Sequence, residues 1–333
     1  MAHVRCSALA AGMLPWLLLA STVAAAQPAP RFELADGDTV ALVGSTFIDR
    51  EQQQGYIETR LVSQFPGKRI RFRNLGWDGD TVDEQHRPEK FGTTLDHLRR
   101  LKPTVLLVSY GMMESQQGEA GLAKFASKNG ELLDHYQKVT ARIVVVAPPP
   151  FEQGPAGSPS AAQQNKKLSS YVAVIERICR ERSVVFVDLF RKLLLDQSKN
   201  GPLTQNGVHL SAYGYWRVGQ VIASELGLNS PEGEAWVGTS GRVGPERNRA
   251  EKLRALIQEK NELFYYRYRP HNGEYVYGRR SKTFSSNSGN NQFPAEMAKF
   301  DELIAAADEQ IRLLSLPESH RSETTQEDTK EGS

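Results

Sequence analysis

The chain has 333 residues, of which 39% are hydrophobic and 24% are charged, and its formal net charge is +2. This is the composition of an ordinary globular protein, long enough for one large domain or two smaller ones. A charge so close to neutral argues against binding to nucleic acid or to a membrane surface through bulk charge.

The first 26 residues are predicted to be a secretory signal peptide. Arg5 supplies a positive flank, Met13–Ala26 is almost continuously apolar, and three alanines stand directly before Gln27. This layout predicts cleavage after Ala26 and a secreted or periplasmic protein. An uncleaved membrane anchor is the alternative, although the apolar run is short for a spanning helix. Cleavage would leave Cys179 as the only cysteine, so no intramolecular disulfide is expected.

Apolar segments along the chain predict a parallel sheet. A first strand runs from Thr39 to Val43, and a brief second strand from Arg69 to Phe72. Three unbroken apolar runs rich in β-branched residues follow, at Val105–Val108, Ile143–Ala147 and Val184–Val187. Runs of this kind suit strands that are buried on both faces. Their spacing of about 40 residues leaves room for a helix and two loops, the rhythm of βαβ units.

Helical spacing of apolar residues fills the intervals between these strands. The expected helices are Gln54–Phe65, Thr93–Leu101, Leu122–Val139, Ala161–Glu181 and Ser211–Leu226. The sequence therefore predicts an α/β domain from about residue 31 to residue 228, a three-layer α/β/α sandwich around a central parallel sheet.

A C-terminal extension follows this domain. Residues 229–249 are rich in Gly, Pro, Ser and Glu and predict a linker or a long surface loop. Residues 250–316 predict a helical extension, with helices at Ala250–Tyr268 and Phe293–Leu314. Residues 317–333 are charged and lack apolar side chains, so this tail is predicted to be disordered.

The run Asn261–Pro270 within this extension interleaves aromatic residues with arginine. Such a pattern can stack on nucleic-acid bases, but export and near-neutral charge argue against that partner. Two interpretations stay open. Leu263, Phe264 and Tyr266 fall at helical spacing and predict core packing, whereas the rings and guanidinium groups also suit a lid that contacts carbohydrate.

Four segments at the predicted strand ends carry the candidate site. Gly44-Ser45-Thr46 ends the first strand, and Asn74–Thr81 follows the second. Tyr110–Glu114 follows the third, and Asn206–His209 stands before the last helix of the domain. The carboxyl ends of parallel strands are where ligands collect in open α/β sheets. Taken alone, a turn of Gly, Ser and Thr needs no chemistry to explain it.

In order and spacing these segments resemble the four characteristic blocks of the SGNH (GDSL-type) hydrolases. The resemblance implies a flavodoxin-like SGNH fold and hydrolysis of ester bonds, with an acyl or acetyl ester of a carbohydrate among the candidate substrates. It implies a small-molecule or carbohydrate ester as partner, and neither a cofactor nor a metal ion.

The same resemblance assigns roles to individual residues. Thr46 takes the place of the nucleophile and Ser45 that of the aspartate before it. Gly79 would donate its backbone N–H to the oxyanion hole, and His209 would be the general base.

Three positions depart from the family pattern. The methyl group of Thr46 crowds the nucleophile and stiffens χ1, and Ser45 is a less hindered alcohol one residue early. Met113 replaces the asparagine of the oxyanion hole, and a thioether donates no hydrogen bond. The loss of one such donor costs about 10²–10³ in rate. Asn206 replaces the aspartate that orients the histidine, and the equivalent change elsewhere costs about 10⁴.

Neighbouring polar residues are further candidates. Asp78 and Asp80 flank Gly79 and are predicted to bind a ligand hydroxyl or to re-orient His209, with Trp77 beside them as a binding residue. Glu114 is a weaker candidate of the same kind. A further carboxylate, Asp188, ends a predicted strand and is expected to cap a turn or helix.

Two functions compete on this sequence. One is an ester hydrolase that uses Thr46 and His209, and the other is a non-catalytic relative that keeps the pocket and binds glycan or another polar ligand. A structural or assembly role for the C-terminal helices is a third and weaker hypothesis.

Overall fold

The computed structural model describes Met1 and residues 32–228, 245–269 and 293–316. The predicted signal peptide, the tail 317–333 and most of the predicted linker therefore lie outside the described residues. The described residues from Phe32 onward belong to one compact unit, so the helices of the extension and the sheet are parts of the same body.

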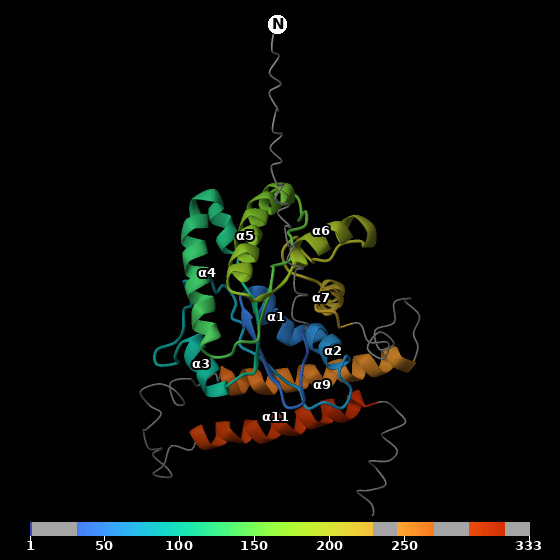
Figure 1. The fold of residues 1–333 in the computed structure, drawn as a ribbon. Coiled ribbons are helices and arrows are strands. Elements are labelled where there is room, and N and C mark those ends of the chain that lie inside the picture. Colours follow the sequence, from blue (N-terminus) through green and yellow to red (C-terminus); the bar gives the residue numbers. More distant parts are fainter. Residues whose placement is uncertain (2–31, 229–244, 270–292, 317–333) are drawn as a thin grey trace, which may run out of the picture. The chain divides into compact units, whose positions relative to one another are not determined.

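A five-stranded parallel sheet forms the centre of the domain (Figure 1), with the strand order β2-β1-β3-β4-β5. The strands are β1 (Thr39–Gly44), β2 (Arg71–Asn74), β3 (Val105–Ser109), β4 (Ile143–Val146) and β5 (Val185–Val187). All four strand pairs are parallel, as the unbroken apolar runs predict.

Helices cover both faces of this sheet. On one face lie α3 (Thr94–Leu101), α4 (Leu122–Gln137) and α5 (Ala161–Glu181). On the other lie α1 (Thr46–Gln54), α2 (Tyr56–Val62), α6 (Leu189–Asn200) and α7 (Ala212–Glu225). Successive residues of β1 divide between the two cores, because side chains alternate across a strand. The predicted three-layer α/β/α architecture is confirmed.

The first helical region differs from the sequence prediction. The helix expected over Gln54–Phe65 is present as the shorter α2, and an additional helix, α1, precedes it, divided from it by Gly55 in a left-handed conformation at φ 69°. The buried Glu51 carboxylate accepts the backbone N–H of Ile57 at 2.7 Å and so satisfies the start of α2. Apolar spacing does not reveal α1, because only two of its nine residues are apolar.

The extension forms two long helices that lie side by side (Figure 1), α9 (Pro245–Tyr268) and α11 (Phe293–Ser315). α9 begins at Pro245 instead of the predicted Ala250, so the predicted linker is shorter than expected. Lys260 on α9 is fully buried, and its Nζ lies 2.7 Å from both carboxylate oxygens of Glu58. The same Nζ donates to the Phe72 carbonyl of β2 at 3.1 Å.

These contacts place the extension against the edge strand β2, whose backbone would otherwise be open to pairing with another chain. Arg73 of β2 also pairs with Asp308 of α11 at 2.5 Å. The extension is therefore an integral part of the domain.

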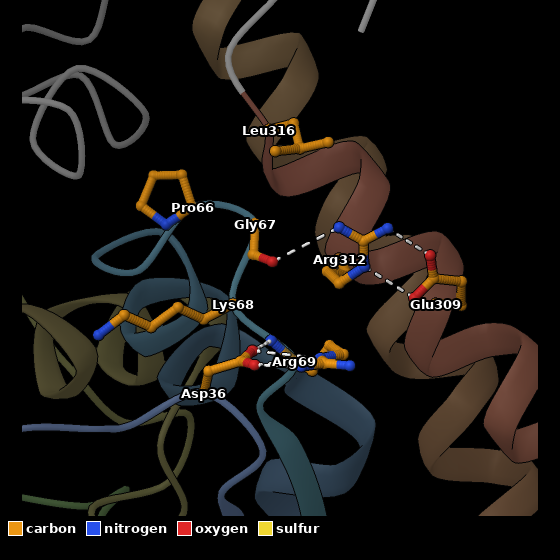
Figure 2. A pocket seen from close by; sticks show the side chains of 8 residues that line it. All are labelled: Asp36, Pro66, Gly67, Lys68, Arg69, Glu309, Arg312 and Leu316. Carbon is orange, nitrogen blue, oxygen red and sulfur yellow. Dashed lines mark hydrogen bonds and ion pairs between the residues drawn. The ribbon is translucent and has the colours of Figure 1, made fainter. Parts of the chain in front are cut away.

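The C-terminal end of α11 is hydrogen-bonded to the loop before β2 (Figure 2). The Gly67 N–H donates to Ser315 Oγ at 2.9 Å, and Arg312 donates to the Gly67 carbonyl at 3.5 Å. Gly67 has φ 77°, and a Cβ there would lie 2.7 Å from a methyl carbon of Leu316. The left-handed φ favours glycine at this position, and a larger residue would also have to displace the end of the Leu316 side chain. Among the described residues no helix is long and apolar enough to span a membrane.

Candidate functional site

The candidate site lies where the strand order reverses. The chain leaves β1 toward β2 and then returns to β3 on the other side of β1, and ligands bind at such switch points in open α/β sheets. Thr46 follows β1, Met113 follows β3, and His209 precedes α7. All three line one small hollow of about 70 Å³, here called the Thr46 pocket. The sequence prediction that these segments converge agrees with this placement.

The wall of the Thr46 pocket is largely apolar. Its apolar lining includes Phe47, Met112, Met113, Pro148, Pro149, Val208, Leu210 and Tyr215. Its polar lining includes Ser45, Thr46, Arg50, Ser109, Tyr110 and His209. The volume suits a small acyl group and is well below that of a site for a drug-sized ligand.

Thr46 is the first residue of α1, and its hydroxyl is held by two partners from the loop after β2. Thr46 Oγ1 donates to Asp78 Oδ1 at 2.5 Å. It accepts the backbone N–H of Gly79 at 3.3 Å. Gly79 has φ 75°, a left-handed conformation that turns this N–H toward Thr46 without steric cost. The structure thus joins the predicted nucleophile to the predicted oxyanion donor and to a carboxylate.

Ser45, the alternative alcohol, is buried beside Thr46 and lines the same pocket. Its hydroxyl has no hydrogen-bond partner among the described residues. Neither Asp78 nor Gly79 therefore activates Ser45 in this structure. A buried hydroxyl of this kind is poised to meet a polar group of a ligand.

The orientation of the Asn206 amide decides which nitrogen of His209 carries the proton. Asn206 Oδ1 accepts the backbone N–H groups of His209 at 2.8 Å and Val208 at 3.2 Å. Because both partners are donors, the oxygen must face them, and Nδ2 then lies 3.4 Å from His209 Nδ1. A hydrogen bond from Nδ2 requires the neutral imidazole to accept at Nδ1, so this contact favours the tautomer with its proton on Nε2.

This tautomer changes what His209 can do. An Nε2–H group donates a hydrogen bond but takes no proton from a nucleophile. Burial lowers the pKa of His209, and the positive charge of Arg50 lowers it further, so the neutral ring is favoured. His209 is therefore placed as a hydrogen-bond donor of the Thr46 pocket.

Met113 and Glu114 occupy the third block. Met113 is 45% exposed at the rim of the pocket and offers no donor. Glu114 is buried, and its two oxygens accept the backbone N–H groups of Val82 and Gly111, each at 2.9 Å. Burial raises the pKa of this carboxyl. Glu114 therefore ties two loops together and does not face a ligand.

Two predicted binding residues lie away from the pocket. Asp80 is buried, and its oxygens accept from the Arg87 guanidinium at 2.7 and 2.5 Å. Two guanidinium carbons lie close to the Trp77 ring, that of Arg87 at 4.2 Å and that of Arg269 at 3.8 Å from its centroid. Neither residue lines the Thr46 pocket. Both side chains contact arginines outside the pocket, and a role for them in ligand binding stays a prediction.

The described part of the Asn261–Pro270 run packs beneath the second block. Arg269 donates to the Gly76 carbonyl and pairs with Asp49 at 3.0 Å. Tyr268 is buried against Trp77 and other aromatic rings. No residue of 261–269 lines the Thr46 pocket. Tyr268 and the partly buried Phe264 therefore pack against the core, as the first interpretation predicts, whereas Tyr266 lines a separate hollow together with α1. These residues form no lid over the Thr46 pocket.

The remaining observations concern the Asp188 cap, groups that could bind a metal ion, and Arg50. Asp188 caps α6 by accepting the Arg191 N–H at 3.0 Å, as expected. The described residues contain no group of three or more side chains suited to hold a metal ion. Sequence reasoning missed Arg50, although its position four residues after Thr46 would have placed it on the same helix face.

Comparison with known proteins identifies the family. The sequence model of the GDSL-like lipase/acylhydrolase family matches residues 39–217, more than half of the chain. The chain belongs to this family. The matched region contains all four blocks of the site, whereas α9 and α11 lie beyond it.

Several solved structures are similar to this acylhydrolase-family chain. One is LAE5, described as an alpha/beta hydrolase enzyme from the metagenome of Lake Arreo, Spain. It is 17% identical with a TM-score of 0.48, over 59% of this chain and 99% of that chain. Another is Axe2, an acetylxylan esterase from Geobacillus stearothermophilus, 17% identical with a TM-score of 0.48, over 59% of this chain and 97% of that chain. A search of curated proteins found no match.

Proposed function

We propose that this chain hydrolyses esters of short acyl groups, with acetyl the best fit, and that Thr46 is the nucleophile. The observation that carries the proposal is the Thr46 hydroxyl, held between the Asp78 carboxylate and the Gly79 N–H at a small, mostly apolar pocket. Membership in an acylhydrolase family supports ester hydrolysis. The pocket volume of about 70 Å³ supports a short acyl chain.

Asp78 takes the role of proton acceptor in this proposal, because it already accepts the hydrogen of the Thr46 hydroxyl. As Oγ1 bonds to the acyl carbon, its proton passes to Asp78. The bond to the alcohol oxygen then breaks, and that oxygen receives the proton from Asp78. Water attacks the acyl-Thr46 in the same way, releasing the acid and restoring the hydroxyl. Asp78 thus replaces the base that the tautomer of His209 removes.

The negative charge that develops on the acyl oxygen needs donors. The Gly79 N–H lies beside Oγ1, and the Thr46 N–H belongs to the first turn of α1, where the helix leaves N–H groups unpaired. His209 supplies Nε2–H as a further donor, in place of the amide that Met113 lacks. Asp78 becomes neutral when it takes the proton of Thr46, at the same time as the acyl oxygen becomes negative. The net charge of the site therefore stays constant, and Asp78 does not repel the oxyanion once it is formed.

Substitutions of Asp78 and His209 distinguish a mechanism in which Asp78 is the base from one in which His209 is the base. With p-nitrophenyl acetate, Asp78→Asn should lower kcat by at least about 10²-fold. If His209 were the base, the same change would leave kcat unchanged or raise it, because it removes a negative charge from the oxyanion site. His209→Gln keeps an N–H donor and should retain part of the activity. Thr46→Ala should abolish hydrolysis, and a fluorophosphonate probe should label Thr46.

A non-catalytic binding protein is the second candidate. The Asn206 amide supports it, because the geometry that removes the general base from His209 leaves the pocket and its donors in place. This candidate predicts no labelling by the fluorophosphonate and no ester hydrolysis by the wild type. It also predicts that acetylated sugars shift the NMR signals of His209.

A further inference from the structure

A second hollow, of about 380 Å³, lies between α1 and α9 and is here called the α1–α9 groove. Helix α1 contributes Asp49, Gln52 and Gln53 to its lining. Helix α9 contributes Gln258, Glu262, Tyr265 and Tyr266. Because α9 lies beyond the region that the family model matches, this groove is an addition of the extension.

The groove lies farther along the face of α1 that carries Thr46. Asp49 and Gln53 follow Thr46 by three and seven residues, a spacing that places all three on one face of a helix. At about 1.5 Å per residue, Gln53 lies roughly 10 Å along the helix from Thr46. Thr46 lines the small pocket, and the helix face that carries it leads along α1 to the larger groove.

The groups that line the groove suit a neutral ligand with many hydroxyls. The three glutamines offer both donors and acceptors, and the two carboxylates offer acceptors. Two tyrosines add aromatic rings held edge to face, with centroids 5.8 Å apart. No lysine or arginine lines the groove, and the nearby Arg269 is already paired with Asp49, so the lining favours a neutral ligand over an anionic one.

Several of these side chains are already held in place. Asp49 is paired with Arg269 at 3.0 Å, and Gln258 donates to the Gln53 carbonyl at 2.5 Å. Tyr266 donates to Glu262 at 3.3 Å. Side chains that are ordered before binding lose less conformational entropy when a ligand arrives.

We infer that the α1–α9 groove binds the alcohol part of the substrate, a neutral oligosaccharide whose ester enters the Thr46 pocket. The inference rests on the proposed ester hydrolysis. In this arrangement the acyl group occupies the apolar hollow at Thr46. The sugar chain runs along α1 into the groove, where it contacts the tyrosines and glutamines.

A binding measurement tests the groove without relying on turnover. Xylotetraose and cellotetraose should bind saturably to the Thr46→Ala variant in isothermal titration calorimetry, and tetragalacturonate should bind more weakly. Tyr265→Ala and Gln53→Ala should each weaken xylotetraose binding about five- to tenfold. Tyr213→Ala removes an exposed tyrosine that lines neither hollow and serves as the matched control, with unchanged affinity. Circular dichroism checks that each variant folds.

Absence of saturable tetraose binding, or equal affinity of the groove variants and the parent, would overturn the inference. Kinetics with the otherwise unaltered chain then separate the two proposals. Tyr265→Ala should raise KM for an acetylated xylotetraose and leave KM for p-nitrophenyl acetate unchanged. If the wild type hydrolyses neither ester, the proposed function fails while the binding data still decide the groove. If both esters are cleaved and Tyr265→Ala changes neither KM, the groove fails alone.

Discussion

Replacing Asn206 with aspartate should reverse the tautomer of His209 and restore it as a base. In the present structure Oδ1 accepts two backbone N–H groups, and Nδ2 lies 3.4 Å from His209 Nδ1. In Asn206→Asp an oxygen takes the place of Nδ2 and accepts only from a protonated Nδ1. A carboxylate at this distance stabilises the imidazolium by about 1–2 kcal/mol, after allowance for solvent screening at a partly exposed ring.

This stabilisation should raise the pKa of His209 by about 1 from its present value, which burial and Arg50 hold below the ordinary value of 6.5. A pH titration of the imidazole nitrogens by ¹⁵N NMR reports both the pKa and the protonated nitrogen. His97, whose pKa burial lowers to about 4, is an internal control that should not change. Hydrolysis of p-nitrophenyl acetate should rise at least about tenfold. Protonation of Nδ1 already in the wild type would refute the assignment of the amide, and an unchanged His209 pKa would refute the electrostatic argument.

Four further results are expected. Met113→Asn returns a donor to the Thr46 pocket and should raise kcat for an acetyl ester by up to about 10²-fold, whereas an unchanged kcat would show that the position does not reach the oxyanion. Lys260→Met leaves the buried Glu58 carboxylate without its partner, so urea denaturation should show a free energy of unfolding lower by about 3–5 kcal/mol. The double variant with Glu58→Leu should recover most of this loss. Because the folded-state pKa of His97 lies at about 4, below its unfolded value, the stability that its neutral form contributes is present above pH 6.5 and is lost as the pH falls toward 4. His97→Gln should therefore make the decline in stability between pH 6.5 and 4 less steep, by up to about 1.4 kcal/mol per pH unit. Mass spectrometry of the exported protein should find Gln27 at its N-terminus, and a chain that retains Met1 would contradict the predicted cleavage.

Much of the fold can be predicted from local patterns of apolar residues in the sequence. The β-branched run Ile143–Val146 reads as a buried parallel strand in isolation, because every one of its side chains needs an apolar neighbour. The order of the four blocks likewise indicates that Thr46, Gly79 and His209 meet at one sheet edge, since parallel strands present their carboxyl ends together. The break at Gly55 and the short, polar helix α1 are not visible in this way, because a helix with few apolar residues carries little periodic signal.

The division of roles within the site depends on contacts that no local pattern contains. Asp78 and Asp80 are equivalent candidates in sequence, two residues apart on one loop. The fold aims Asp78 at the Thr46 hydroxyl and buries Asp80 against Arg87. The sequence alone determined which residue types reach the site, because spacing along strands and helices sets their positions. Which carboxylate is available for chemistry depends on the folded arrangement, because packing brings Arg87 within hydrogen-bonding distance of Asp80 and leaves Asp78 to the Thr46 hydroxyl.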